Sequence, residues 1–258
     1  MKRANFLRLM LVIIGFGLLG LSCAKQEPNQ ALSKNNAPTT VAPEVEPQTE
    51  ETVVKPAQPV PVAKPVEHVL RVLAVPFTSQ APDSNWDMPY QEACEEASMI
   101  MVAEYLAGNH TMRLSIDYAD KKILELVAWE ETNGYAIDVT AKQVVAILRE
   151  RYGIAARVEP YSADRLRQAI QVKQPVILPA AGKLLKNPNF KNGGPLYHML
   201  VVKGFEANEF ITNDPGTRKG KSYRYHQTIL QNAIRDYPTG EHKPILKERK
   251  AMIVVSRR

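Results

Sequence analysis

The chain has 258 residues, which is enough for one ordinary domain with extensions. Its formal net charge of +6 overstates the charge of that domain, because residues 67–258 hold 26 basic and 22 acidic side chains. No basic stripe with interleaved aromatic residues accompanies this mild excess, so we expect no nucleic-acid partner.

Residues 1–23 predict a signal peptide. A basic start precedes an apolar run over residues 9–21, which is short for a membrane span. The run ends in LGLSC, which resembles a bacterial lipobox, and this resemblance implies lipidation of Cys23. We therefore expect an exported protein that is lipid-anchored to the membrane and faces the periplasm or the cell surface; a retained anchor helix is the alternative.

Residues 24–66 predict a disordered, Pro-rich tether. The segment is rich in Pro, Val, Thr, Glu and Lys and has no aromatic residue. Such a composition buries too little apolar surface to offset the entropy lost on ordering, and its X-Pro pairs favour extended conformations.

Residues 67–258 are predicted to form the folded domain. The segment HVLRVLAVPFTSQ predicts a strand that ends at Pro76, and the segment APDSNWDMP that follows predicts a loop. A helix is predicted next. It begins near Cys94, carries apolar residues at helical spacing and ends at Gly108 and Asn109.

Further helices and then strands are predicted along the rest of the domain. Residues 115–134 predict a second helix, Thr140 and Ser162 are N-cap residues of two more, and a short strand over 156–161 lies between those two. The remaining strands are predicted in the segments PVILPAA, HMLVVKGF, EFITNDP, KSYRYHQ and AMIVVSRR. Helices first and strands later indicate an α+β domain with a largely antiparallel sheet.

Cys94 is one of only two cysteines in the chain. If Cys23 is lipidated, Cys94 has no disulfide partner and is either a buried, inert thiol or a free, reactive one. In the first turn of a helix, the N–H groups and the helix dipole stabilise a thiolate. Glu95 and Glu96 oppose this, and the net effect depends on where their carboxylates point.

His198 and Asp214 are predicted to lie on paired strands. His198 begins an apolar strand after a Gly-Gly-Pro loop, and Asp214 ends the next strand. The short link GFEANE favours a hairpin, which brings the imidazole and the carboxylate close together. A carboxylate on one ring nitrogen fixes the tautomer of a histidine that acts as a base. Taken singly, each residue also fits an ordinary core or turn position.

The order Cys, His, Asp resembles that of papain-like cysteine peptidases. More closely, the segments VPFTSQ, ACEEASMIMVAEYL, YHMLVVKGF and ITNDPGT…YRY resemble cysteine peptidase family thirty-nine, whose founding members trim leaders from exported bacteriocins. The resemblance implies helices packed on a C-terminal antiparallel sheet. It also implies Cys94 as nucleophile, His198 as general base and acid, and Asp214 as the residue that orients the imidazole.

The same resemblance implies a glutamine in the oxyanion hole. Gln80 follows the predicted strand as in the family pattern but is far from Cys94 in sequence, whereas Gln91 is near but lies one turn back. We favour Gln80. The leader-processing members are fused to transporter modules, but this chain has no G-x-x-x-x-G-K-[ST] phosphate loop. Its five histidines show no metal-binding spacing, so we expect no metal or cofactor.

These observations predict a membrane-tethered cysteine peptidase that hydrolyses peptide or amide bonds through a Cys-His-Asp triad. Two alternatives stay open. One is a cell-wall amidase or transpeptidase-like enzyme with the same triad. The other is a non-catalytic peptide-binding module on this fold, since a fold alone does not establish a function.

Overall fold

The computed structural model describes residues 70–238 and 244–257. The predicted signal peptide, the lipidation site Cys23 and the tether over residues 24–66 lie outside the described residues. In the part that is described, no helix is long and apolar enough to cross a membrane.

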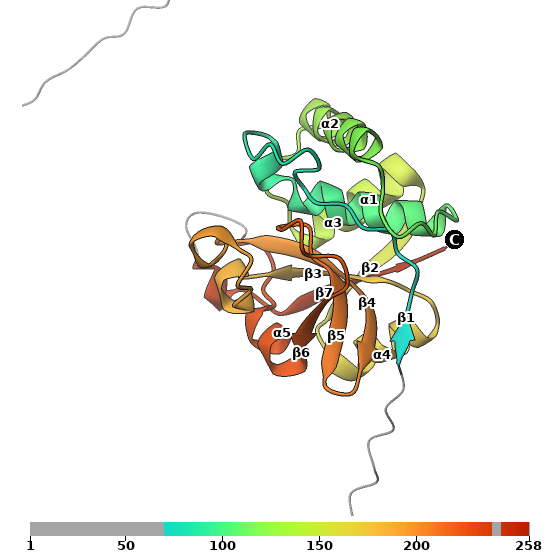
Figure 1. Ribbon diagram of the computed structural model, residues 1–258, viewed down its shortest axis with the longest axis vertical. Helices are drawn as coiled ribbons and strands as arrows, with labels where there is room; N and C mark the ends of the chain where they lie inside the picture. Colours follow the sequence, from blue (N-terminus) through green and yellow to red (C-terminus); the bar gives the residue numbers. More distant parts are fainter. Residues whose placement is uncertain (1–69, 239–243, 258) are drawn as a thin grey trace, which may run out of the picture. The chain divides into compact units, whose positions relative to one another are not determined.

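A seven-stranded antiparallel sheet forms the centre of the domain (Figure 1). Its strands pair in the order β2-β7-β3-β4-β5-β6, and the short β1 pairs with the far end of β4. The strands are β1 (Arg71–Val72), β2 (Ala155–Pro160), β3 (Val176–Ala180), β4 (His198–Glu206), β5 (Glu209–Asn213), β6 (Tyr223–His226) and β7 (Ala251–Ser256). Strands β3, β4 and β7 are almost entirely buried, in keeping with their continuous apolar sequences.

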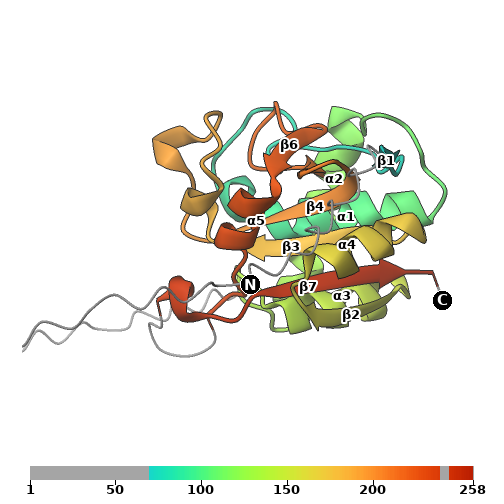
Figure 2. The same ribbon diagram turned by 90° about the horizontal axis from the view of Figure 1, so that it is seen from below.

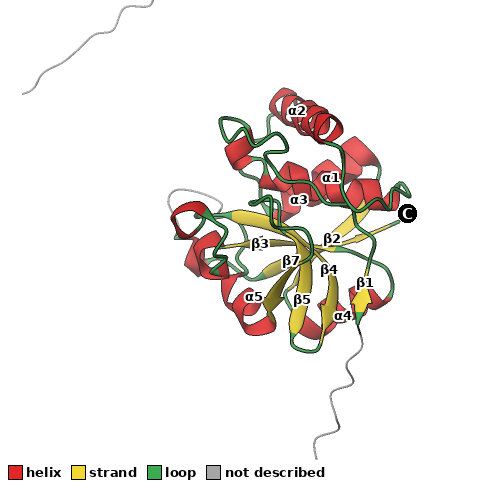
Figure 3. Ribbon diagram, in the orientation of Figure 1, coloured by secondary structure: helices red, strands yellow, loops and turns green. Residues whose placement is uncertain are grey.

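Five α-helices cover this sheet (Figure 3). They are α1 (Cys94–Leu106), α2 (Ile116–Thr132), α3 (Ala141–Tyr152), α4 (Ala163–Gln171) and α5 (Gln227–Ala233). Helices α1, α2 and α3 gather on one side of the strands (Figure 1). Helices α4 and α5 lie on the other side, where they overlie the strands in the view from below (Figure 2). The predicted α+β class, with helices packed on an antiparallel sheet, is confirmed.

Helix α1 begins at Cys94, the predicted nucleophile. Its first ten residues, from Cys94 to Ala103, are all buried, because the helix packs against β4 as well as against α2 and α3. The short 3-10 helix η1 (Tyr90–Glu92) leads directly into it. The start of α1 is therefore held between the sheet and the other helices.

The predicted caps and stops explain several helix boundaries. Thr140 and Gln143 form a complete capping box at the start of α3, and Gly153 ends that helix in the left-handed conformation with φ of 66°. The side chain of Ser162 accepts the Arg165 N–H at the start of α4. Local sequence therefore contributes to these ends, and at the start of α3 a distant side chain adds to it, since the Ala141 N–H donates to Asp236 Oδ1 at 2.8 Å.

Two elements differ from the prediction. The predicted strand before Pro76 is reduced to β1, because the carbonyls of Val75 and Pro76 accept hydrogen bonds from the Asn213 side chain, each at 3.0 Å, instead of joining a ladder. Residues 227–233 form helix α5, although no helix was predicted there from the sequence.

Candidate active site

Cys94 lies at the first position of α1 with its side chain almost completely enclosed. The residue is 5% exposed. Its Sγ donates a hydrogen bond to Glu95 Oε2 at 2.8 Å. The backbone N–H of Met199, the residue after His198, faces the sulfur and lowers the pKa of the thiol. The start of β4 and the start of α1 thus meet at the thiol.

Burial and the carboxylates beside Cys94 together determine the protonation state of its thiol. Burial raises the pKa of the thiol well above its usual value, and the charge of Glu95, the hydrogen bond to Glu95 and the charge of Glu96 raise it further. The Met199 N–H acts in the opposite direction but does not prevail. Burial and the two acids together therefore outweigh the stabilising effect expected of the helix N-terminus, and the resting residue is a neutral thiol.

Glu95 is fully buried at the same point. Its second oxygen, Oε1, accepts the Val139 N–H at 3.4 Å, so both oxygens of the carboxyl group are engaged. Burial and the nearby charge of Glu96 raise the pKa of Glu95 well above its usual value. Cys94 and Glu95 therefore form a buried pair in which two negative charges cannot easily exist together.

Glu96 has its partner on α2. It shares a hydrogen bond with Glu130, which requires one of the two carboxyl groups to hold a proton. Burial is the main reason that the pKa of Glu96 rises to about 7 and that of Glu130 to about 10. Two adjacent glutamates on α1 thus have different partners, one the thiol and the other a carboxyl group of α2.

His198 and Asp214 form a buried pair at the ends of β4 and β5. The distance from His198 Nε2 to Asp214 Oδ1 is 2.8 Å, and both side chains are almost inaccessible to solvent. Because Nε2 faces the carboxylate, Nδ1 is the ring nitrogen left to exchange a proton with another group. The hairpin predicted from the link GFEANE is present, with Glu206 opposite Glu209.

Asp214 is held by three further donors. Its Oδ1 accepts the Gly216 N–H at 3.0 Å, and its Oδ2 accepts the Tyr225 hydroxyl at 2.5 Å and the Asn187 amide at 3.3 Å. Burial alone would raise the pKa of Asp214, but the charge of His198 and these hydrogen bonds hold it below its usual value. Asp214 is therefore kept as an anion in a water-excluded position.

Packing around the imidazole leaves little freedom for it to turn. The ring of Phe190 meets that of His198 edge to face, with centroids 5.3 Å apart. A Cβ at Gly216 would lie 2.8 Å from His198 Cε1, so glycine at this position makes room for the ring. Asn213, one residue before Asp214, points elsewhere and holds the segment around Val75.

The two glutamines considered for the oxyanion hole occupy different environments. The Gln80 amide is buried and donates both N–H groups to η1, to Tyr90 O at 3.0 Å and to Gln91 O at 2.8 Å. Its Oε1 has no partner among the described residues. The Gln91 side chain instead lines an open cleft. Gln80 thus holds the turn that precedes Cys94, and its N–H groups are already occupied.

The cleft that Gln91 lines has a volume of about 1020 Å³. It lies between the loop over residues 78–91, the segment that begins α2 and the loops that follow η2 (Gly182–Leu185) and β5. Gly216, which touches the imidazole of His198, lines it as well. The cleft is therefore an approach to the His198 side of the site.

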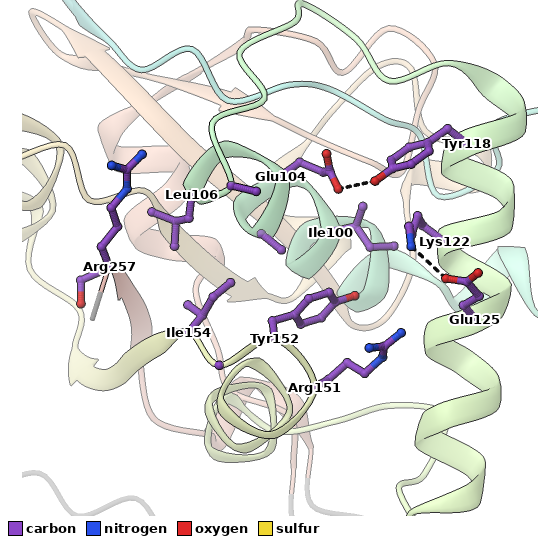
Figure 4. Close-up of a pocket in the computed structure, with 14 residues that line it drawn as sticks. Ile100, Glu104, Leu106, Tyr118, Lys122, Glu125, Arg151, Tyr152, Ile154 and Arg257 are labelled. Carbon is purple, nitrogen blue, oxygen red and sulfur yellow. Dashed lines mark hydrogen bonds and ion pairs between the residues drawn. The ribbon is translucent and has the colours of Figure 1, made fainter.

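A second cavity, of about 440 Å³, lies between the C-terminal half of α1, α2 and the end of α3 (Figure 4). Tyr118 donates to Glu104 at 2.6 Å, and Lys122 pairs with Glu125 at 3.0 Å, so four of its polar side chains pair with one another (Figure 4). None of the predicted site residues lines this cavity.

One protein-family model matches the part of the chain that contains this site. The model described as "Peptidase_C39 like family" matches residues 72–239, which contain Cys94, His198 and Asp214. The chain belongs to the C39-like family. Membership of this family indicates a cysteine peptidase, and thus a hydrolase that acts on peptides.

A crystal structure described as that of a C39-like peptidase from Bacillus anthracis aligns with 74% of this chain and 98% of its own, with 13% sequence identity and a TM-score of 0.48. No curated protein matches the sequence.

Several residues around the C39-like site were not singled out from the sequence. Asn187 and Tyr225 reach Asp214 from other parts of the chain, and Gly216 was quoted only within the segment ITNDPGT. Tyr225 lies in the YRY segment that contributed to the family resemblance, which is the one signal that could have indicated it.

Proposed function

We propose that the protein is an exported, membrane-tethered cysteine peptidase in which Cys94, His198 and Asp214 act as a triad. The observation that carries the proposal is the buried His198–Asp214 pair at 2.8 Å, with the N–H of the next residue, Met199, facing the thiol of Cys94. Export and the lipid anchor at Cys23 rest on the sequence of residues 1–23.

In the acylation step, the Cys94 thiol gives its proton to His198 Nδ1 as the sulfur attacks the carbonyl carbon of the substrate. Asp214 stabilises the imidazolium that forms. The imidazolium then donates this proton to the leaving amine, the C–N bond breaks, and a thioester remains on Cys94. Glu95 holds a proton during this step, because a charged carboxylate would repel the thiolate.

In the deacylation step, His198 takes a proton from water, and the resulting hydroxide adds to the thioester carbonyl. The sulfur leaves and recovers its proton from the imidazolium, so the product is a carboxylate and the thiol is restored. The backbone N–H groups at the start of α1, which have no acceptor within the helix, are suited to the oxyanion. Gln80 stays the proposed side-chain donor, with Gln91 as the alternative, and for Gln80 this requires release of one of its bonds to η1.

Digestion of a peptide library and a muropeptide library with the wild-type protein tests the proposal, with Cys94→Ala as the matched control. Cleaved products that appear only with the wild-type protein are expected in the peptide library. Products from muropeptides alone would instead support the amidase alternative, and no products from either library would support a binding module.

A further inference from the structure

The charge of the cleft beside His198 differs from that of the rest of the domain. Four basic side chains line it, those of Arg113, Lys191, Arg218 and Lys219, against a single acidic one, Asp83. Residues 67–258 as a whole are close to balance, with 26 basic and 22 acidic residues. Basic groups therefore concentrate in the cleft that Gly216, the neighbour of the His198 imidazole, helps to line.

These four cations also lack the carboxylate partners that five other arginines of the described domain have. Arg157 and Arg224, for example, lie 2.7 Å from the carboxylates of Glu159 and Glu206. Among the described residues, none of the four cleft cations has a carboxylate within ion-pair distance. Their charge is thus available to a bound molecule.

Two of the four are held in place by uncharged groups. The guanidinium of Arg113 lies 4.5 Å above the centre of the Phe77 ring, and Arg218 donates to Ser84 Oγ at 3.0 Å. Neither contact neutralises the charge. Trp86, which also lines the cleft, is 40% exposed and offers an apolar surface beside these cations.

We propose that this cleft binds the acidic part of the substrate, so that the enzyme prefers peptides with Glu or Asp on one side of the scissile bond. The proposal rests on the proposed peptidase function and adds its substrate class. Opposite charges in a cleft raise the local concentration of the ligand and orient it. An exposed ion pair typically contributes about a threefold factor, so two of them give about tenfold.

The test uses two pairs of peptides, and the members of each pair differ only by Glu in place of Gln at two positions. In one pair both positions precede the scissile bond, and in the other pair both follow it. For one side, the wild-type protein is expected to show a kcat/KM about tenfold higher with Glu than with Gln at low ionic strength. The ratio should fall toward one in about 0.5 M salt, since these charges are exposed to solvent. Equal kcat/KM values for Glu and Gln peptides on both sides would overturn the proposal.

Lys191 and Lys219 are the residues to change, because both are exposed and neither side chain forms a hydrogen bond within the part of the chain that the structure describes. In Lys191→Glu/Lys219→Glu, the preference for Glu peptides should disappear or reverse. The control is Lys142→Glu/Lys247→Glu, which makes the same change in net charge at exposed positions that do not line the cleft. An equal loss of preference in both double variants would show that overall charge, not the cleft, is responsible.

Binding separates this proposal from the proposed function. Fluorescence anisotropy of labelled peptides on Cys94→Ala measures the cleft without turnover, and a Glu peptide should bind about tenfold more tightly than its Gln partner. If this preference appears but the wild-type protein cleaves nothing, the hydrolase proposal fails and the cleft proposal stands. If the wild-type protein cleaves Glu and Gln peptides equally, the reverse holds.

Discussion

Glu95→Gln is the change that most sharply tests the electrostatics at the thiol. Glutamine keeps the shape of the side chain and can donate an N–H to the sulfur, but it carries no charge. In the wild-type protein a carboxyl oxygen lies 2.8 Å from Cys94 Sγ. Two like charges at that distance repel by about 6 kcal/mol at an effective dielectric constant of about 20. The thiolate therefore forms readily only while Glu95 holds a proton.

The expected result follows from this repulsion. As pH rises, ionisation of Glu95 opposes ionisation of the wild-type thiol, so its reactivity should rise only weakly. The variant lacks this opposition. Relief of only a quarter of the repulsion, about 1.4 kcal/mol, corresponds to about tenfold more thiolate, so Glu95→Gln should react at least about tenfold faster at alkaline pH. Below the raised pKa of Glu95, the two proteins should react alike.

The assay is the rate of alkylation by iodoacetamide between about pH 5 and pH 9, followed by intact mass in a Cys23→Ala background, where Cys94 is the only cysteine. Glu96→Gln is the matched control. It removes one buried acid from the same turn, but Glu96 is bonded to Glu130 and not to the thiol. Identical rates for the wild-type protein and Glu95→Gln at every pH, or an equal gain in Glu96→Gln, would refute the reasoning.

Three further outcomes are expected. The raised pKa values of Glu96 and Glu130 mean that the folded state keeps protons that the unfolded state loses above about pH 4.5. The free energy of unfolding should therefore fall as pH rises toward 10, by about 1.4 kcal/mol per pH unit for each retained proton. Glu130→Gln should flatten the fall in Tm between pH 5 and 9, whereas the same change at the exposed neighbour, Glu131→Gln, should not. Asp214→Ala should lower kcat by about 10²–10⁴, while Asn213→Ala should lower Tm with little change in kcat, and a crippled kcat in Asn213→Ala alone would reverse the assignment. Cys23→Ala should move the protein from the detergent phase to the aqueous phase, and unchanged partitioning would exclude the lipid anchor.

Much of the fold could be predicted because its signals are local. Thr140, Ser162 and Gly153 determine helix ends through hydrogen bonds and backbone conformation within a few residues. The buried strands β3 and β7 are continuous apolar runs, and β4 is mostly apolar between His198 and Glu206. The hairpin that joins β4 to β5 follows from a short link, and it is what brings His198 and Asp214 within 2.8 Å.

What could not be predicted depends on contacts between distant residues. Nothing in the local sequence indicates that Glu95 and Glu96 are buried with different partners, since acidic residues in a first helical turn are ordinarily solvated. Asn187 and Tyr225 meet at one oxygen of Asp214 from separate parts of the chain. The predicted strand before Pro76 is short because a side chain, that of Asn213, takes its carbonyls.

The most direct test of the central claim is the mass of the protein itself during turnover. Wild-type protein is mixed with a peptide that it cleaves, quenched in acid within the first turnover and analysed by intact mass and peptide mapping. The account predicts an added mass equal to the acyl part of the peptide, located on Cys94 and absent in Cys94→Ala. Cleavage that leaves no adduct on Cys94 and proceeds equally in Cys94→Ala would contradict it.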